Sequence, residues 1–216
     1  MKNETTELVF ILDKSGSMAG LEKDTIGGFN ALVEKQRKLP GDVLVTTVLF
    51  NHCYELLHDR ISLRGISTLT EMDYEVGGTT ALYDAIGSTI QKFINIHMRT
   101  SESERADKVM FVITTDGMEN ASSEYSAKKI HEMIAKQKNM LNWEFVFLGA
   151  NIDAAATAKQ FGVAEEFAVE YHADADGTEL NYRVLSEAVS SFRSGQPLDR
   201  TWKKEIEKDY NSRSKK

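Results

Sequence analysis

The chain has 216 residues, of which 41% are hydrophobic and 27% are charged, and it contains only two prolines. These proportions are typical of a globular protein, and they exclude a disordered chain, a collagen-like repeat and a small disulfide-stapled scaffold. The formal net charge of −7 argues against a general nucleic-acid binder, and the single cysteine, Cys53, has no partner for an intramolecular disulfide.

The first half of the chain alternates apolar strands with amphipathic helices. Residues 8–12 form a continuous apolar run, which predicts a buried strand that ends at Asp13. Residues 21–38 have a helical apolar spacing and are followed by Pro40 and Gly41, which end the helix. Strands are expected over 43–51 and 54–61, and they must be antiparallel because their link is too short for a crossover. The loop 77–80 then precedes a helix over 81–97.

The second half repeats this alternation. The expected order is a strand over 108–114, a helix over 124–138, a strand over 143–148, a short helix over 154–161, a weak strand over 166–171 and a last helix ending near 193. We expect Ser122 or Ser123 to cap the helix over 124–138, and the stretch 176–179 to open the last helix as a capping box.

This order of elements predicts an α/β fold. We expect a Rossmann-like open sheet, mostly parallel with one antiparallel edge strand, and with helices on both faces. The domain would cover residues 1–195, and a polar basic tail would cover 196–216. Residues 200–216 carry a net charge of +4 while the rest carries −11, so we expect a solvated extension in which Trp202 is disordered.

Localisation is predicted from what the sequence does not contain. No apolar run approaches the roughly 18 residues of a membrane span. The polar start of the chain, and a first apolar run of only residues 8–12, do not fit a signal peptide. We therefore expect a cytoplasmic protein that binds neither membrane nor nucleic acid.

Oxygen-bearing side chains follow the predicted strands where parallel strands end. Asp13, Ser15 and Ser17 alternate in the first loop, so their oxygens can converge on one side of a tight turn. Asp116 follows the strand over 108–114, and the loop 77–80 supplies Thr79 and Thr80. Ligands of open α/β sheets bind at this end of the strands. Carboxylates and hydroxyls without His or Cys suit Mg²⁺, with Mn²⁺ or Ca²⁺ as further options, and leave a coordination position for an outside oxygen.

These motifs make residues 5–195 resemble a von Willebrand factor type A (VWA) domain. The metal-ion-dependent adhesion site (MIDAS) of that family has the pattern Asp-x-Ser-x-Ser, then a Thr, then an Asp. Asp13, Ser15, Ser17, Thr80 and Asp116 match it in order. The resemblance implies that the hydroxyls contact the metal and that the two Asp side chains bind it directly or through water. It also implies a protein of the intracellular bacterial or phage type.

The resemblance further implies a non-enzymatic module that binds another protein. A carboxylate of that partner would complete the metal shell. The main alternative is a phosphohydrolase of the haloacid dehalogenase type, with Asp13 as nucleophile, but that chemistry needs a second acid two residues later, where this chain has Ser15. Asp84 has two interpretations: it hydrogen-bonds a water of the metal shell, or it is an ordinary acid on a helix surface.

Overall fold

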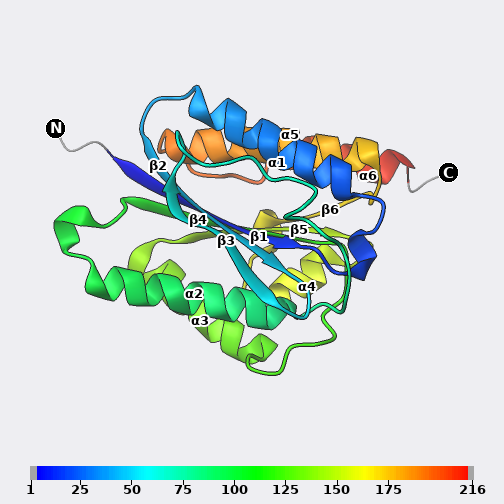
Figure 1. Cartoon of the computed structure of the whole chain (residues 1–216), viewed down its shortest axis with the longest axis horizontal. Coiled ribbons are helices and arrows are strands. Elements are labelled where there is room, and N and C mark those ends of the chain that lie inside the picture. Colours follow the sequence, from blue (N-terminus) through cyan, green and yellow to red (C-terminus); the bar gives the residue numbers. More distant parts are fainter. Residues whose placement is uncertain (1–3, 214–216) are drawn as a thin grey trace.

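A six-stranded sheet forms the centre of the molecule (Figure 1). The computed structural model describes residues 4–213. The strand order is β3-β2-β1-β4-β5-β6, and every neighbouring pair is parallel except β2 and β3. The predicted open sheet with one antiparallel edge strand is therefore confirmed. The strands are β1 (Thr5–Asp13), β2 (Asp42–Phe50), β3 (Tyr54–Ser62), β4 (Lys108–Thr115), β5 (Glu144–Ala150) and β6 (Ala168–Tyr171).

Helices cover both faces of the sheet, as predicted. In Figure 1, α1, α5 and α6 lie above the sheet and α2, α3 and α4 lie below it. None of the helices in the described part of the chain is long and apolar enough to cross a membrane. Their bounds are α1 (Glu22–Arg37), α2 (Leu82–Arg99), α3 (Ala127–Leu141), α4 (Ala154–Gln160), α5 (Ala175–Arg193) and α6 (Lys204–Arg213).

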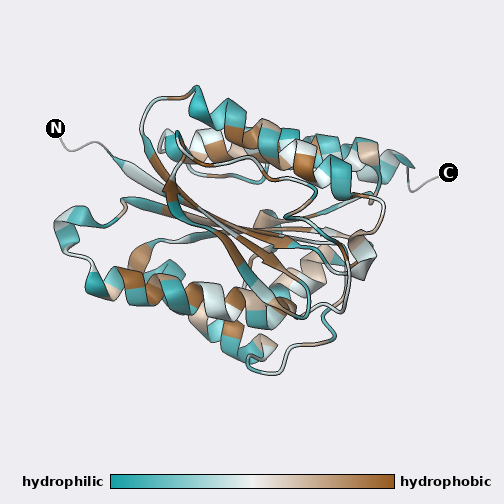
Figure 2. Ribbon diagram, in the orientation of Figure 1, coloured by the Kyte–Doolittle hydropathy of each residue, from teal (hydrophilic) through white to brown (hydrophobic). Residues whose placement is uncertain are grey.

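The alternation of side chains along β1 divides the core into two layers. Leu8, Phe10 and Leu12 pack in the layer beneath α1 and α5, whereas Val9 and Ile11 pack in the layer against α2 and α3. All five of these side chains are completely buried. Successive residues of a strand point to opposite faces, so a strand covered on both faces must be apolar throughout. Figure 2 shows this as brown strands between helices with teal outer faces.

Two helix caps differ from the sequence prediction. Ser126, rather than Ser122 or Ser123, accepts from the Lys129 amide and caps α3. Asp174 accepts from the Gly177 amide and caps α5, so the helix begins at Ala175 without the predicted capping box. Both caps are short polar side chains in extended backbone, which is what an N-cap requires.

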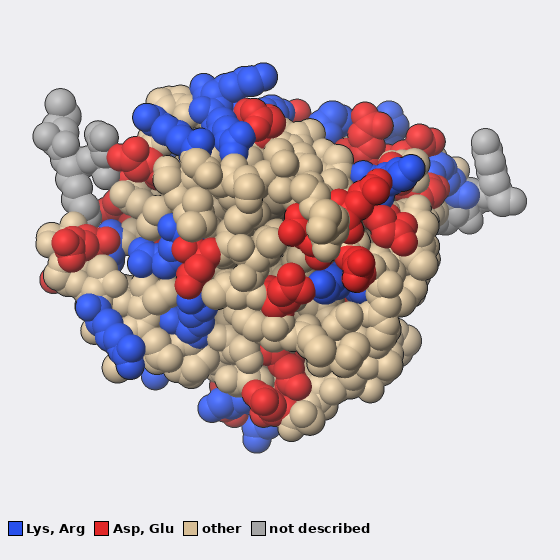
Figure 3. All heavy atoms as spheres, viewed as in Figure 1, with Lys and Arg blue, Asp and Glu red and all other residues tan. Residues whose placement is uncertain are grey.

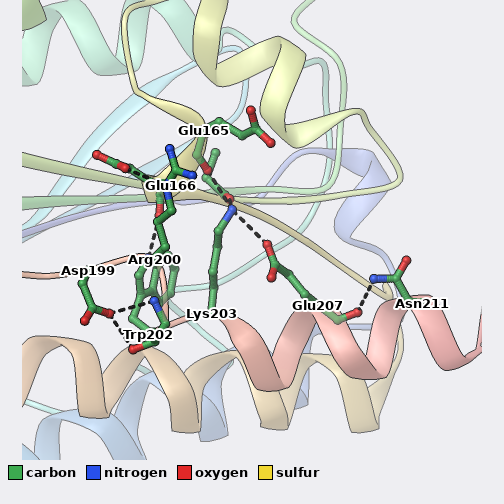
Figure 4. Close-up of polar contacts among 10 residues, drawn as sticks. Glu165, Glu166, Asp199, Arg200, Trp202, Lys203, Glu207 and Asn211 are labelled. Carbon is green, nitrogen blue, oxygen red and sulfur yellow. Dashed lines mark hydrogen bonds and ion pairs between the residues drawn. The ribbon is translucent and has the colours of Figure 1, made fainter.

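Up to Arg213, the C-terminal segment corrects the prediction of a solvated extension over 196–216, and residues 214–216 lie outside the described part. Residues Lys204–Arg213 form α6, which packs on β6 and α5, and Ile206 is 1% exposed. Trp202 is ordered: its indole Nε1 donates to the Glu166 carbonyl at 2.9 Å. The Lys203 ammonium donates to the Glu165 and Ala168 carbonyls, each at 2.7 Å (Figure 4). One of the basic residues of this segment, Lys203, therefore contributes to the fold.

Candidate metal centre

The predicted site residues lie at one end of the sheet, where its strand order reverses. β1 and β4 are neighbours at the centre, and the chain turns outward from each in opposite directions. Leu12 and Thr114 are paired in register, so the loops that begin at Asp13 and Asp116 leave the sheet side by side. Such a switch point is where open α/β sheets bind their ligands.

The first loop turns its oxygens toward each other, as the alternation of Asp and Ser predicts. The Ser15 amide donates to Asp13 Oδ1 at 2.7 Å, and the Ser15 and Ser17 hydroxyls are 3.0 Å apart. Asp13 and Ser15 are buried, at 0% and 1% exposure, whereas Ser17 lies at the surface. The loop thus extends from the buried strand end to the solvent.

The second loop is fastened to the first through its backbone. The Gly16 amide donates to the Gly78 carbonyl at 3.0 Å, and the Gly77 amide donates to the Lys14 carbonyl at 2.9 Å. Of the two candidate threonines, Thr80 is buried, at 3% exposure, and Thr79 is exposed. Thr80, rather than Thr79, therefore supplies the hydroxyl that faces the other two loops.

Asp116 and Gly117 bring the third loop against the other two. A Cβ placed on Gly117 would lie 2.7 Å from Ser17 Oγ and 3.1 Å from Thr80 Oγ1. A larger residue here would displace the Ser17 hydroxyl. Asp116 is 3% exposed, and its Oδ1 is buried without a hydrogen-bond partner among the described residues. All five predicted side chains therefore gather in one place, while their role as ligands stays a prediction.

The centre carries two buried carboxylates without a cation. Burial raises the pKa of Asp13 above its ordinary value, hydrogen bonds from Thr115 and Ser15 oppose the rise, and the charge of Asp116 adds to it. Burial also raises the pKa of Asp116, against hydrogen bonds from Ser17 and Asn151. Lys14 does not neutralise them, because its ammonium pairs with Glu55 at 2.5 Å.

Three residues that support the centre are missing from the sequence prediction. Thr115 Oγ1 donates to Asp13 Oδ2 at 2.5 Å and links the ends of β1 and β4. The buried Tyr74 hydroxyl donates to the Asp13 carbonyl. Asn151 approaches Asp116 from the loop after β5. The role of Thr115 could have been predicted from the sequence, because it directly precedes Asp116. No neighbouring residue indicates the role of Tyr74.

The residues present fit a divalent cation. The donor set consists of two carboxylates and three hydroxyls, which are the hard oxygens that Mg²⁺, Mn²⁺ and Ca²⁺ prefer. Asp116 Oδ1 lacks a partner at a place where buried polar atoms ordinarily have one. In residues 4–213 no group of three or more His, Cys, Asp or Glu side chains is placed to hold a metal ion, so hydroxyls are needed to complete this shell.

Asp84 has a structural role that neither sequence interpretation foresaw. Its carboxylate accepts from the backbone amides of Ser123, Glu124 and Tyr125 at 2.8–3.0 Å. These bonds tie the loop after β4 to the first turn of α2. Asp84 therefore holds the third loop of the centre through backbone contacts.

We expect Asp84→Ala to lower the free energy of unfolding by about 2 kcal/mol, because three amides lose a charged acceptor. Metal affinity should change by less than about threefold, since Asp84 contacts none of the five candidate ligands. Urea unfolding and calorimetry with Mn²⁺ measure the two effects. A tenfold loss of Mn²⁺ affinity without loss of stability would instead favour the metal-shell interpretation.

Comparison with family models and with curated proteins gives no match for this chain. Solved structures do match. VWA2, an ArnB paralogue from Sulfolobus acidocaldarius, is 21% identical with a TM-score of 0.56, over 87% of this chain and 46% of that one. Proximal thread matrix protein 1 from the mussel byssus, with a zinc-occupied MIDAS motif, is 14% identical with a TM-score of 0.59, over 87% and 46%.

The manganese-loaded TRAP protein of Plasmodium vivax is 19% identical with a TM-score of 0.53, over 83% of this chain and 72% of that one. This chain has the VWA fold. It spans about half the length of the first solved structures it matches. Two of the three structures named here contain a divalent metal: zinc in the MIDAS motif of the mussel protein, and manganese in TRAP. The bacterial or phage type stays a prediction.

Proposed function

We propose that this chain is a metal-dependent protein-binding module with the VWA fold. Its ligand would be a carboxylate side chain of a partner protein. The observation that carries the proposal is the gathering of Asp13, Asp116 and three hydroxyls around the unpartnered Asp116 Oδ1. No cation among the described residues pairs with either carboxylate.

The candidate ligands lie between the interior and the surface. Asp13 and Asp116 would hold the inner side of the ion, with Ser15, Ser17 and Thr80 supplying hydroxyl oxygens. A bound Mg²⁺ would supply positive charge and an open coordination position, with Mn²⁺ or Ca²⁺ as substitutes. Ser17 is exposed and Met118 is 75% exposed, so a partner can approach this side.

Charge explains why such a module needs its metal. Residues 1–199 carry a net charge of −11, and two of these negative charges are the carboxylates at the centre. A partner's Asp or Glu would be repelled by this end of the metal-free chain. The cation reverses the local sign, so we expect partner binding to depend on it.

The arrangement of Asp13 supports a binding module over the phosphohydrolase. Both of its carboxylate oxygens accept hydrogen bonds, from the Ser15 amide and the Thr115 hydroxyl. These two bonds orient the carboxylate and leave each oxygen a lone pair for a cation. Ser15 also leaves the position of the required general acid without a carboxyl group.

Calorimetry with Mg²⁺ and Mn²⁺ tests the site. We expect saturable binding by the natural chain and its loss in the Asp13→Ala, Ser15→Ala double variant, which removes a carboxylate and a hydroxyl. Asp176→Asn is a suitable control, because it removes one exposed carboxylate in the first turn of α5. Equal binding by the double variant and the natural chain would reject the assignment.

Two further measurements separate the alternatives. Hydrolysis of a phosphate ester by the natural chain, abolished in Asp13→Asn, would favour the phosphohydrolase. A metal with a purely structural role predicts that chelation lowers the melting temperature and leaves capture of partner proteins unchanged. Our proposal predicts that chelation abolishes the capture.

A further inference from the structure

A hollow lined by basic side chains lies between β3 and the second half of α2. It is open to solvent, and its volume is about 450 Å³. In Figure 3, several Lys and Arg side chains lie on the left of this view, around the left end of α2, with Asp and Glu side chains among them. The hollow is lined by Arg60, Lys92, Asn95, Ile96, Arg99 and Thr100.

The backbone of Arg60 is distorted in a way that orients its side chain. Arg60 has a φ of 52°, in the left-handed region that a bulky side chain rarely adopts. The β2–β3 register is irregular on both sides of Thr47, and the Arg60 amide donates to Thr46 Oγ1 at 3.1 Å. Bulges of this kind redirect a side chain at a sheet edge, and strained residues cluster at ligand sites.

Only one nitrogen of the Arg60 guanidinium forms a hydrogen bond with the described residues. Its Nε donates to Glu7 Oε1, a carboxylate whose side chain is 4% exposed. Its two Nη atoms have no hydrogen-bond partner among the described residues, although a guanidinium has five N–H donors. Glu7 thus anchors one side of the group and leaves its remaining donors beside the hollow.

Arg99 supplies a cation without a counter-charge. It forms no ion pair or hydrogen bond within residues 4–213. Lys92 pairs with Asp59 at 2.8 Å, and both side chains are partly exposed. Asn95 accepts from Gln91 through its oxygen, so its amide nitrogen is free to donate. Three cations and one amide therefore face the hollow. Arg60 and Lys92 each have one carboxylate partner, and Arg99 has none among the described residues.

We propose that this hollow binds a phosphoryl group or a similar doubly charged oxyanion. Arg60 and Arg99 provide planar donor pairs that match such oxygens, Lys92 provides a point charge and Asn95 a neutral donor. The site is separate from the metal centre. α2 begins beside the Thr80 loop and is 18 residues long, ending at Arg99, which is about 27 Å along a helix.

Titration with pyrophosphate and with inorganic phosphate, followed by amide NMR in metal-depleted buffer, tests this site. Without divalent ions, the metal centre cannot contribute phosphate binding. We expect saturable shifts of the amides of residues 58–62 and 92–100. A parallel titration uses a short phosphoserine peptide. Tighter binding of this peptide would identify a partner's phosphorylated side chain as the source, and tighter binding of pyrophosphate would identify a small molecule.

The decisive variant is Lys92→Gln with Arg99→Gln, which leaves the buried Arg60–Glu7 pair intact. Loss of two charged contacts should weaken pyrophosphate binding at least about tenfold. The matched control is Lys23→Gln with Arg64→Gln, which removes the same charge from exposed positions elsewhere. If the two double variants weaken pyrophosphate binding equally, the effect comes from net charge alone and the proposal is wrong. Amide shifts that do not saturate would also overturn it.

Discussion

Metal-free Asp116→Asn should unfold at a higher temperature than the metal-free natural chain, and it should lose the stabilisation that Mg²⁺ gives. The two buried carboxylates repel each other without a cation, and burial raises both of their pKa values. An amide removes one of these charges while keeping the size of the side chain. The gain is on the order of 1 kcal/mol, the usual scale of a single substitution.

With Mg²⁺ bound, the natural chain should have a higher melting temperature than Asp116→Asn. A cation at 100 times its Kd stabilises the folded natural chain by about 2.7 kcal/mol, which is roughly 5–10 °C for a domain of this size. Calorimetric melting of both proteins, with Mg²⁺ and with chelator, measures the four values. Asp176→Asn, on the surface of α5, should behave as the natural chain does. A higher melting temperature of Asp116→Asn in Mg²⁺ than in chelator would contradict the assignment.

Local patterns of the sequence predicted the fold and the main residues of the centre. The central strands β1, β2, β4 and β5 have apolar or β-branched runs. The residues after β1 and β4 could be assigned to one end of the sheet because parallel strands share a direction. The choice between Thr79 and Thr80 needed the structure, because burial of one side chain depends on how the loop 77–80 packs against Lys14 and Gly16.

Contacts between distant segments could not be predicted in this way. Tyr74 reaches the Asp13 carbonyl, and Asp84 accepts amides from residues 123–125. Nothing near Tyr74 or Asp84 in the sequence indicates these partners. The caps of α3 and α5 were misplaced for a related reason. Several Ser or Asp residues precede each helix, and all of them satisfy the local rule.

The C-terminal segment is the largest difference between sequence and structure. Its basic, polar composition is typical of a solvated tail. Among its described residues, Ile206 is the one buried apolar side chain, and Lys203 donates to backbone carbonyls, which no charge pattern reveals. β6 is an edge strand of only four residues, so the segment also covers an edge that would otherwise be open.

We therefore expect a chain that ends at Pro197 to lose about 4 kcal/mol of unfolding free energy. Burial of one Ile contributes about 1.5–3 kcal/mol, and each carbonyl left without Lys203 costs about 1–3 kcal/mol if it stays buried. Urea unfolding measures the loss, and sedimentation velocity should show self-association through the uncovered β6. Removing only residues 214–216 is the control, since it leaves α6 in place. If the packing of Ile206 stabilises the fold, Ile206→Ala should reproduce about half of the loss. An unchanged urea midpoint in the chain ending at Pro197 would show that α6 contributes nothing to the stability of the fold.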